Sequence, residues 1–195
     1  MAITTPIWRS DPAQFTNDLF AWISEQGATR YDESVTQLEH ALQSAALAVS
    51  ERRADSEVAA ALLHDVGHLL MDEHQERDDF LGEDLKHEIV GANWLSSFFP
   101  ESITQPIRLH VPAKRYLCSL DKEYWSSLSN ASKKSLERQG GPMEKSEIIE
   151  FEQQTGYEDA VRIRRYDDRA KVADREVPPL SEYSDLIRNL LRNPD

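Results

Sequence analysis

The sequence predicts an all-α fold, and three observations support this prediction. Apolar residues recur three or four positions apart through most of the chain, which is the period of an amphipathic helix. No segment of more than four residues alternates between apolar and polar side chains with turn signals on both sides, as a half-buried strand does. Prolines, glycines and capping residues divide the 195 residues into helix-length pieces, and nothing marks a second domain.

The first helix is expected to follow Asp11, which precedes Pro12 as an N-cap residue precedes a proline in the first helical position. Gly27 then ends this helix. We expect residues 1–27 to form an N-terminal arm and helix, residues 28–177 a metal-binding core, and residues 178–195 a C-terminal helical segment.

The next two helices contain the first candidate site residues. Residues 35–50 carry an apolar stripe that places Val49 inward and His40 beside it. A third helix, capped near Asp55, is expected to contain the run from residue 60 to 70, Ala-Ala-Leu-Leu-His-Asp-Val-Gly-His-Leu-Leu.

The remaining segments alternate between loops and further helices. The charged segment 71–84, which contains His74, is expected to be a surface loop, and residues 111–117 a turn or short element. Pro106 should kink the helix that contains Ile103, Ile107 and His110, or delay its start. The other helices are expected at residues 87–95, 103–110, 130–138, 146–154, 158–171 and 181–192.

Composition excludes several functional classes. No apolar run approaches the roughly 20 residues of a membrane span, and the N-terminus lacks the pattern of a secretion signal. The single Cys118 allows no intrachain disulfide, so we expect a cytoplasmic protein. A net charge of -13 would repel a nucleic-acid backbone, so no nucleic-acid or membrane partner is expected.

An adjacent histidine and aspartate, His64 and Asp65, lie inside an apolar run. Buried ionisable groups are costly unless they are paired or bound to a metal. Metal ligation therefore explains the pair best, with His68 on the same helix face as His64. The alternative is a pair of core or capping histidines.

Five of the six histidines lie beside apolar stripes that must face one core. With Asp65 and one late carboxylate, they supply enough ligands for two metal ions, and a bridging aspartate would serve both. Imidazole and carboxylate donors suit iron, zinc, manganese or nickel. The five histidines are His40, His64, His68, His87 and His110.

This pattern resembles the HD-domain superfamily, an all-α metal-binding fold with the signature His…His-Asp…Asp. His40, the pair His64 and Asp65, and Asp167 stand at the signature positions. The additional His87 and His110 resemble the dinuclear branch of that superfamily.

The flanking segments narrow the resemblance to the mixed-valent di-iron oxygenases that cleave carbon–phosphorus bonds. The segments around His40 and His64, the Lys-Arg-Tyr-Leu run at residues 114–117, the Gln-Gly-Gly-Pro-Met run at 139–143 and the Ile-Arg-Arg-Tyr-Asp run at 163–167 carry it. It covers residues 28–185. Members of this family act on 2-amino-1-hydroxyethylphosphonate or on its N-trimethylated analogue.

The resemblance implies an Fe(II)/Fe(III) pair with O2 as co-substrate. One iron would be held by His40, His64, Asp65 and Asp167, and the second by Asp65, His87 and His110. Asp65 would bridge the two ions and, with His68, belong to the catalytic residues.

The same resemblance implies a phosphonate pocket made of His68, Lys114, Ser132, Ser135 and Arg164. A doubly charged phosphonate in an acidic protein needs basic and hydroxyl donors in a confined place, which agrees with this set. The alternative for Lys114 and Arg164 is ordinary surface ion pairing with the abundant acidic residues.

The cationic end of the substrate is expected to meet Tyr31, Asp32 and Glu33. Glu33 matches a glutamate of the family, but Arg30 stands where the family has a tyrosine. This departure favours the trimethylated substrate, which is held by carboxylates and aromatic faces. Alternatively, Asp32 only stabilises the N-terminus of the following helix.

The expected activity is O2-dependent cleavage of a small organophosphonate. The trimethylated substrate would give glycine betaine and phosphate, and the amine would give glycine and phosphate. Two alternatives remain: a metal-dependent phosphohydrolase acting on a nucleotide or phosphate monoester, and a degenerate domain that only binds a ligand. The full set of six candidate ligands disfavours the second alternative.

Overall fold

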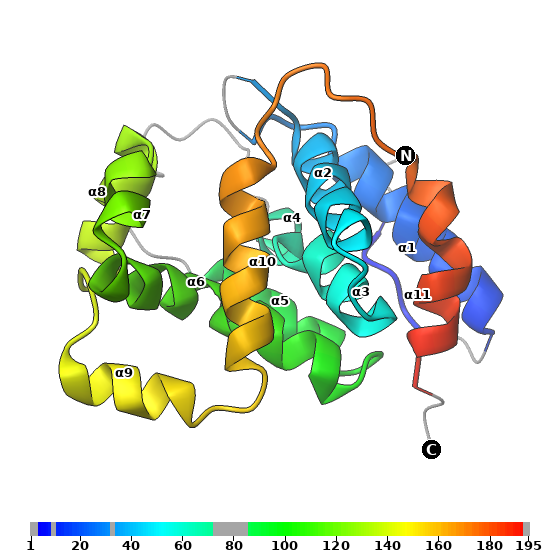
Figure 1. Cartoon of the computed structure of the whole chain (residues 1–195). Coiled ribbons are helices and arrows are strands. Elements are labelled where there is room, and N and C mark those ends of the chain that lie inside the picture. Colours follow the sequence, from blue (N-terminus) through cyan, green and yellow to red (C-terminus); the bar gives the residue numbers. More distant parts are fainter. Residues whose placement is uncertain (1–3, 9–10, 32–33, 72–85, 193–195) are drawn as a thin grey trace.

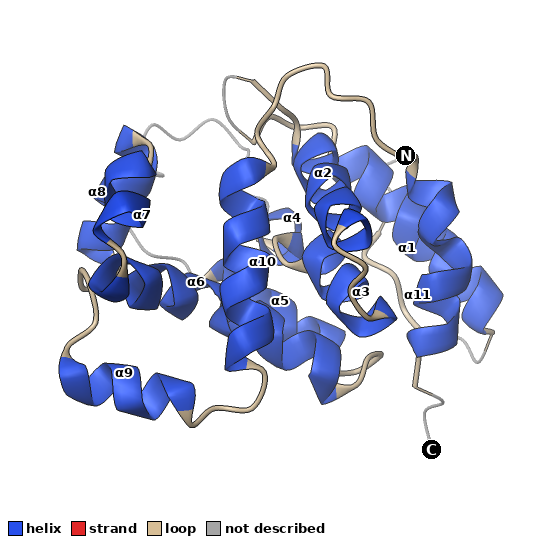
Figure 2. Cartoon of the chain, viewed as in Figure 1, coloured by secondary structure: helices blue, strands red, loops and turns tan. Residues whose placement is uncertain are grey.

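The structure, a computed structural model, describes residues 4–8, 11–31, 34–71 and 86–192. Every regular element in this part of the chain is helical, and its single isolated β-bridge joins Arg30 and Thr36 (Figure 2). The predicted all-α fold is confirmed. The elements are α1 Pro12–Gln26, α2 Gln37–Ser50, α3 Asp55–Leu63, α4 Val66–Leu70, α5 His87–Leu95, α6 Glu101–Leu120, α7 Lys122–Ser127, α8 Asn130–Arg138, α9 Lys145–Glu152, α10 Tyr157–Arg169, the 3₁₀ helix η2 Leu180–Tyr183 and α11 Ser184–Leu190.

Helix α10 lies at the centre of the molecule, and the other helices are arranged on either side of it (Figure 1). It packs against α6, α2 and α3. Helices α1 and α11 contact each other beyond α2 and α3, whereas α7, α8 and α9 gather at the opposite end. The helices that carry the candidate ligands therefore surround one interior point.

One large apolar cluster joins the two ends of the chain to the central helices. It includes Phe15 of α1, Leu63 of α3, Ile163 of α10 and Ile187 of α11, each no more than 1% exposed. The N-terminal and C-terminal segments thus pack on the same core as the central helices. The division at residues 27 and 177 stays a prediction.

The starts of α1 and α2 follow from capping. The Asp11 carboxylate accepts hydrogen bonds from the backbone N–H groups of Ala13 and Gln14, as predicted. Helix α2 begins two residues later than predicted, because Thr36 forms a reciprocal capping box with Glu39.

The buried face of α2 is rotated relative to the predicted stripe. His40 and Ser44 are 0% exposed, whereas Val49, which was expected to point inward, is 50% exposed. Helix α2 packs against both α3 and α10, so it buries a wider face than a helix that packs against a single neighbour. His40 therefore lies inside the core and not beside it.

The run that was predicted as one helix is broken at the His-Asp pair. Helix α3 ends at Leu63 and α4 begins at Val66, with Asp65 at φ -100° and ψ 11° between them. His64 and His68 therefore do not share one helix face, and Asp55 is a first-turn residue whose side chain does not cap the helix. The turn carries the Asp65 carboxylate toward the centre of the molecule.

Helix α6 is continuous where a turn was predicted. It passes through both Pro106 and Pro112, so residues 111–117 are helical and not a separate turn. Each proline removes one backbone hydrogen bond, but α6 is packed against α3, α5 and α10, and this burial outweighs the loss. Helix α8 has the predicted bounds.

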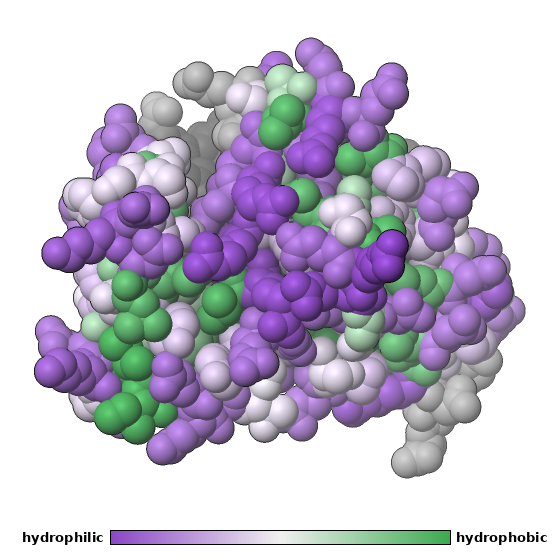
Figure 3. All heavy atoms as spheres, in the orientation of Figure 1, coloured by the Kyte–Doolittle hydropathy of each residue, from purple (hydrophilic) through white to green (hydrophobic). Residues whose placement is uncertain are grey.

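The surface reflects the acidic composition. Hydrophilic residues cover α10 in the view of Figure 3, and hydrophobic residues gather over α9, where Ile149 is 58% exposed. No helix in the described ranges combines the length and apolar character needed to cross a bilayer. The segment predicted as a surface loop, including His74, lies largely outside the described residues.

Candidate functional site

One oxygen of Asp65 faces a first pair of histidines. His40 Nε2 lies 3.4 Å and His64 Nε2 3.3 Å from Asp65 Oδ2, and the two ring nitrogens are 3.2 Å apart. Asp167 Oδ1 lies 3.6 Å from His40 Nε2. The four residues come from α2, the turn after α3 and α10, and the structure brings together all the ligands expected for the first iron.

The other oxygen of Asp65 faces a second pair of histidines. His87 Nε2 lies 3.4 Å and His110 Nε2 3.5 Å from Asp65 Oδ1, and their ring nitrogens are 3.2 Å apart. These histidines come from the start of α5 and the middle of α6. Asp65 thus stands between two imidazole pairs, each next to a different carboxylate oxygen.

Backbone carbonyl groups fix the tautomers of three of these histidines. The Nδ1 atoms of His40, His64 and His110 lie 2.8, 2.8 and 2.7 Å from the carbonyl oxygens of Ala170, Ala61 and Ile107. A carbonyl oxygen can only accept, so Nδ1 carries the proton and donates it. Each Nε2 then has a free lone pair directed at the Asp65 carboxylate, as in metal-ligating histidines.

These donors fit metal ions. Two Nε2 lone pairs 3.2 Å apart cannot bond to each other, and the buried Asp65 Oδ2 has no hydrogen-bond partner in the described part of the chain. Two nitrogen ligands about 2.1 Å from one metal at a right angle stand about 3.0 Å apart. The nitrogen and oxygen donor set suits a divalent transition metal such as iron.

The protonation states of His87 and His110 agree with this interpretation. Burial disfavours the charged form of His64, but the adjacent Asp65 carboxylate raises the pKa of His64 above its usual value. Burial and the neighbouring His68 lower the pKa of His87 to about 3, and burial lowers the pKa of His110. Burial opposes ionisation of Asp65, but the surrounding imidazoles, His64 foremost, hold its pKa well below the usual range. A neutral imidazole beside an ionised carboxylate is the form that binds a metal.

Two glycines let α4 and α5 approach closely enough to form the second group. A Cβ atom on Gly67 would stand 2.0 Å from the His87 carbonyl oxygen, and one on Gly91 would stand 3.0 Å from the Gly67 backbone nitrogen. Only glycine permits this approach. Gly67 is therefore a structural reason why His87 reaches Asp65.

His68 lies at the edge of the second group. Its ring stacks on the His87 ring with centroids 3.8 Å apart, and its Nε2 atom is 4.0 Å from Asp65 Oδ1. Its side chain is 22% exposed, whereas the His110 side chain is 1% exposed. This position suits either a metal ligand or a substrate contact beside the metals, and the predicted catalytic role stays a prediction.

Two of the predicted phosphonate contacts lie together. Lys114 on α6 is 3% exposed, and its Nζ atom donates to Ser135 Oγ of α8 at 3.1 Å. Ser132 lies one turn earlier on α8, where its backbone N–H and hydroxyl bond to Ser129 at the helix cap. Burial and the charge of Arg164 lower the pKa of Lys114 to about 8. A surface role for Lys114 is therefore wrong.

Arg164 is buried and held by two carboxylates. Its Nη1 atom lies 2.6 Å from Asp167 Oδ2, and Asp168 pairs with its other nitrogen atoms. The Tyr124 hydroxyl donates to Asp168 Oδ2 at 2.5 Å and accepts from Arg164 Nε at 3.2 Å. Arg164 is 5% exposed, so the surface ion-pair alternative is wrong for it as well. The two carboxylates thus fix the guanidinium beside Asp167 of the first metal group.

Tyr31 lies over the first metal group. Its ring stacks on the His40 ring with centroids 3.9 Å apart, and its hydroxyl donates to Asp167 Oδ1 at 3.1 Å. Burial raises the pKa of Tyr31 well above its usual value, and so does the charge of Asp167. Asp32 and Glu33, the other residues expected to hold a cationic group, lie outside the described residues.

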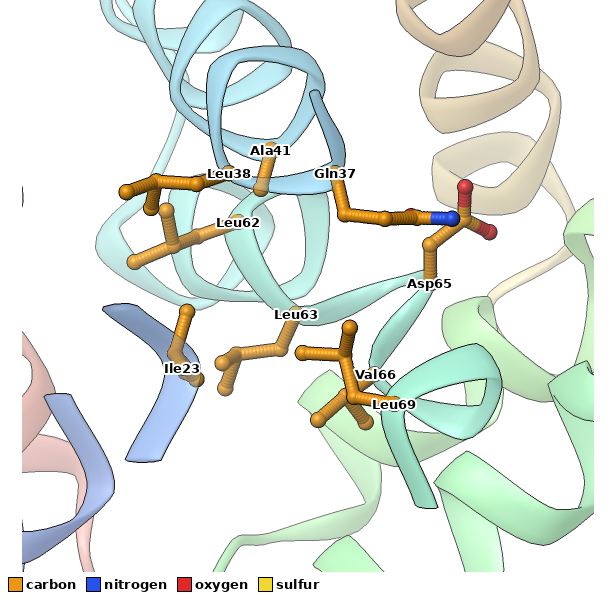
Figure 4. Close-up of a pocket in the computed structure, with 9 residues that line it drawn as sticks. All are labelled: Ile23, Gln37, Leu38, Ala41, Leu62, Leu63, Asp65, Val66 and Leu69. Carbon is orange, nitrogen blue, oxygen red and sulfur yellow. The ribbon is translucent and has the colours of Figure 1, made fainter. Parts of the chain in front are cut away.

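A separate pocket reaches Asp65 from the side of α1 and α2 (Figure 4). Apart from Gln37 and Asp65, its lining is aliphatic: Ile23, Leu38, Ala41, Leu62, Leu63, Val66 and Leu69. None of the predicted phosphonate contacts lines it.

Three residues of the site were not anticipated. Asp168 and Lys171 each lie four residues after a charged partner, Arg164 and Asp167, and this helical spacing could have indicated both. Tyr124 reaches Arg164 from 40 positions away, and no local pattern indicates that contact.

Comparison with known proteins agrees with the geometry. The family model of the HD domain matches residues 37–176, which include the six predicted metal ligands. The chain is 50% identical to the hydroxymethylphosphonate dioxygenase of Gimesia maris over 93% of its length and 90% of that protein. It is 37% identical to the glycine-betaine-forming [1-hydroxy-2-(trimethylamino)ethyl]phosphonate dioxygenase of Leisingera caerulea, over 94% of the chain and 92% of that protein.

Proposed function

The chain belongs to the HD-domain family and is an oxidoreductase of the dioxygenase class, and we propose that it cleaves the carbon–phosphorus bond of a 1-hydroxyphosphonate with O2. The names of the two relatives both describe a phosphonate with a hydroxyl group on the carbon attached to phosphorus. The two phosphonates differ in the substituent on that carbon. The common part defines the proposed substrate.

The observation that carries the proposal is the Asp65 carboxylate between two histidine pairs, with a buried lysine and arginine nearby. The first pair with Asp167 would hold one iron, and the second pair would hold the other. Two iron ions held by these residues would supply the redox chemistry, and the protein would supply positions and charge.

The basic residues define how the substrate would be oriented. Lys114 and Arg164 would bind the phosphonate oxygens, with Ser132 and Ser135 as hydroxyl donors and His68 at the metal edge. Asp168 and Tyr124 hold Arg164 in place, since both bond to its guanidinium. The hydroxyl-bearing carbon would then face the metal pair and not the protein surface.

The proposal is tested by reconstituting the protein with iron without oxygen, adding a 1-hydroxyphosphonate, and then admitting O2. We expect phosphate release that depends on O2, and a paramagnetic signal of a mixed-valent iron pair that changes when substrate binds. Phosphate release without O2, or full activity with zinc or magnesium, would contradict the proposal and would support a phosphohydrolase.

A further inference from the structure

The aliphatic pocket that reaches Asp65 differs in chemistry from the rest of the metal site (Figure 4). Leu62 and Leu63 line its interior and are no more than 3% exposed, whereas Leu38 and Leu69, which also line it, are partly exposed. The pocket therefore connects the protein surface with Asp65, the carboxylate that stands between the two histidine pairs.

The lining of this pocket selects a small apolar occupant. Among the described residues around it, there is no basic side chain to neutralise a phosphonate and no aromatic ring to hold an ammonium group. A bound water molecule needs about two to four polar partners, and of these residues only Gln37 and Asp65 offer any. The space admits about one molecule of the size of water, and O2 is small enough to enter it.

We propose that this pocket is the entry site for O2, which reaches the metal pair at Asp65 by a route separate from the phosphonate contacts. The inference rests on the proposed function and adds the place where the co-substrate enters. Lys114 and Arg164 do not line the pocket, so a phosphonate held by them leaves it open. The Gln37 side chain extends toward Asp65 and marks the inner end of the route (Figure 4).

The first test requires no turnover. Krypton is an apolar atom close in size to O2, and apolar cavities bind such atoms. Crystals of the iron-loaded protein under krypton pressure should show an anomalous peak among Leu38, Leu62 and Leu69. Ala41→Leu adds a branched side chain to the lining from α2 and should remove this peak. The absence of a krypton peak from this pocket in the unmodified protein would overturn the inference.

The second test measures kcat/KM for O2 at saturating hydroxymethylphosphonate. Ala41→Leu should lower this value at least about tenfold, as extra methylene groups in a hydrophobic pocket do, and should leave the KM for the phosphonate unchanged. Leu69→Phe narrows the same pocket from α4 and should act in the same direction. Ala46→Leu is the matched control, because Ala46 lies on α2, is partly exposed and does not line the pocket. It should change neither value.

Iron content reports whether each variant keeps the metal site. Two variants with full iron content and an unchanged kcat/KM for O2 would overturn the inference. So would a raised KM for the phosphonate with no effect on O2, which would place part of the substrate in the pocket. An unmodified protein that binds krypton there but releases no phosphate with O2 would instead overturn the proposed function.

Discussion

At the scale of single residues, Asp65 has a position that no other described carboxylate has. Its two oxygens face different histidine pairs, so replacing it removes a donor from both metal positions at once. We expect Asp65→Asn to lose both iron ions and His87→Ala to lose only the second. The iron affinity of Asp65→Asn should fall by more than the roughly 10–100-fold that is lost when a hydrogen-bond partner of a metal ligand is removed. Iron content per chain measures the difference.

The control for this prediction is Asp168→Asn. Asp168 pairs with Arg164 and has no contact with the histidines among the described residues, so this variant should keep its iron and show a raised KM for the phosphonate. Full iron content in Asp65→Asn would contradict the bridging role.

Lys114 gives a prediction about pH. Its pKa is lowered to about 8, first by burial and then by the charge of Arg164. The cationic form binds the phosphonate, so kcat/KM should be full below pH 8 and should fall as the pH rises through 8. Lys114→Arg keeps the positive charge at high pH and should remove this fall. An identical alkaline limb in both proteins would show that another group titrates.

The sequence indicates the metal ligands well, but it does not indicate Tyr124, which helps to hold Arg164 in place. Histidines and aspartates in an apolar run are unusual enough to be recognised one at a time, and the structure brings His40, His64 and His110 to Asp65 as expected. Tyr124 could not be found in this way, because its contact with Arg164 depends on how α7 packs against α10.

At the scale of elements, the close contact between α4 and α5 positions the second histidine pair. A methyl group on Gly67 would stand 2.0 Å from the His87 carbonyl oxygen, so α5 would have to move away from Asp65. We expect Gly67→Ala to lower iron content and thermal stability together, with a loss of at least about 1–3 kcal/mol of unfolding free energy, as overpacking costs.

Gly141→Ala is a matched control, because Gly141 has φ +73° but nothing within 4 Å of an added Cβ atom. It should cost stability through backbone strain alone and leave iron content unchanged. Iron content that stays full in Gly67→Ala would show that the α4–α5 contact does not position the second site.

The differences between the predicted and observed helices have a common cause. Local signals placed the start of α1 correctly, where the Asp11 carboxylate caps the helix. They failed where tertiary packing decides: the chain breaks at Asp65 although the local pattern is helical, and α6 continues through Pro106 although proline disfavours it. Packing around the site therefore outweighs local propensity at both places.

At the scale of the whole molecule, the metal site links helices that are far apart in the sequence. The six candidate ligands come from α2, the turn after α3, α5, α6 and α10, so metal binding should stabilise the folded chain against unfolding. Metal at about 100 times its dissociation constant contributes about 2.7 kcal/mol, which corresponds to a Tm increase of about 5–10 °C for a domain of this size.

Thermal unfolding with and without a chelator measures this shift. Asp65→Asn, which should bind no metal, is expected to unfold at the same temperature in both conditions. A chelator effect of equal size in that variant would mean that the stabilising metal binds elsewhere.

The central claim is that Asp65 bridges two metal ions, each beside its own pair of histidines. Anomalous diffraction at the iron edge, from crystals of the iron-loaded protein, tests it most directly. We predict two iron peaks about 3.5–4 Å apart, as in two-metal sites, each next to a different oxygen of Asp65. A single peak, or two peaks of which neither touches the Asp65 carboxylate, would contradict the claim.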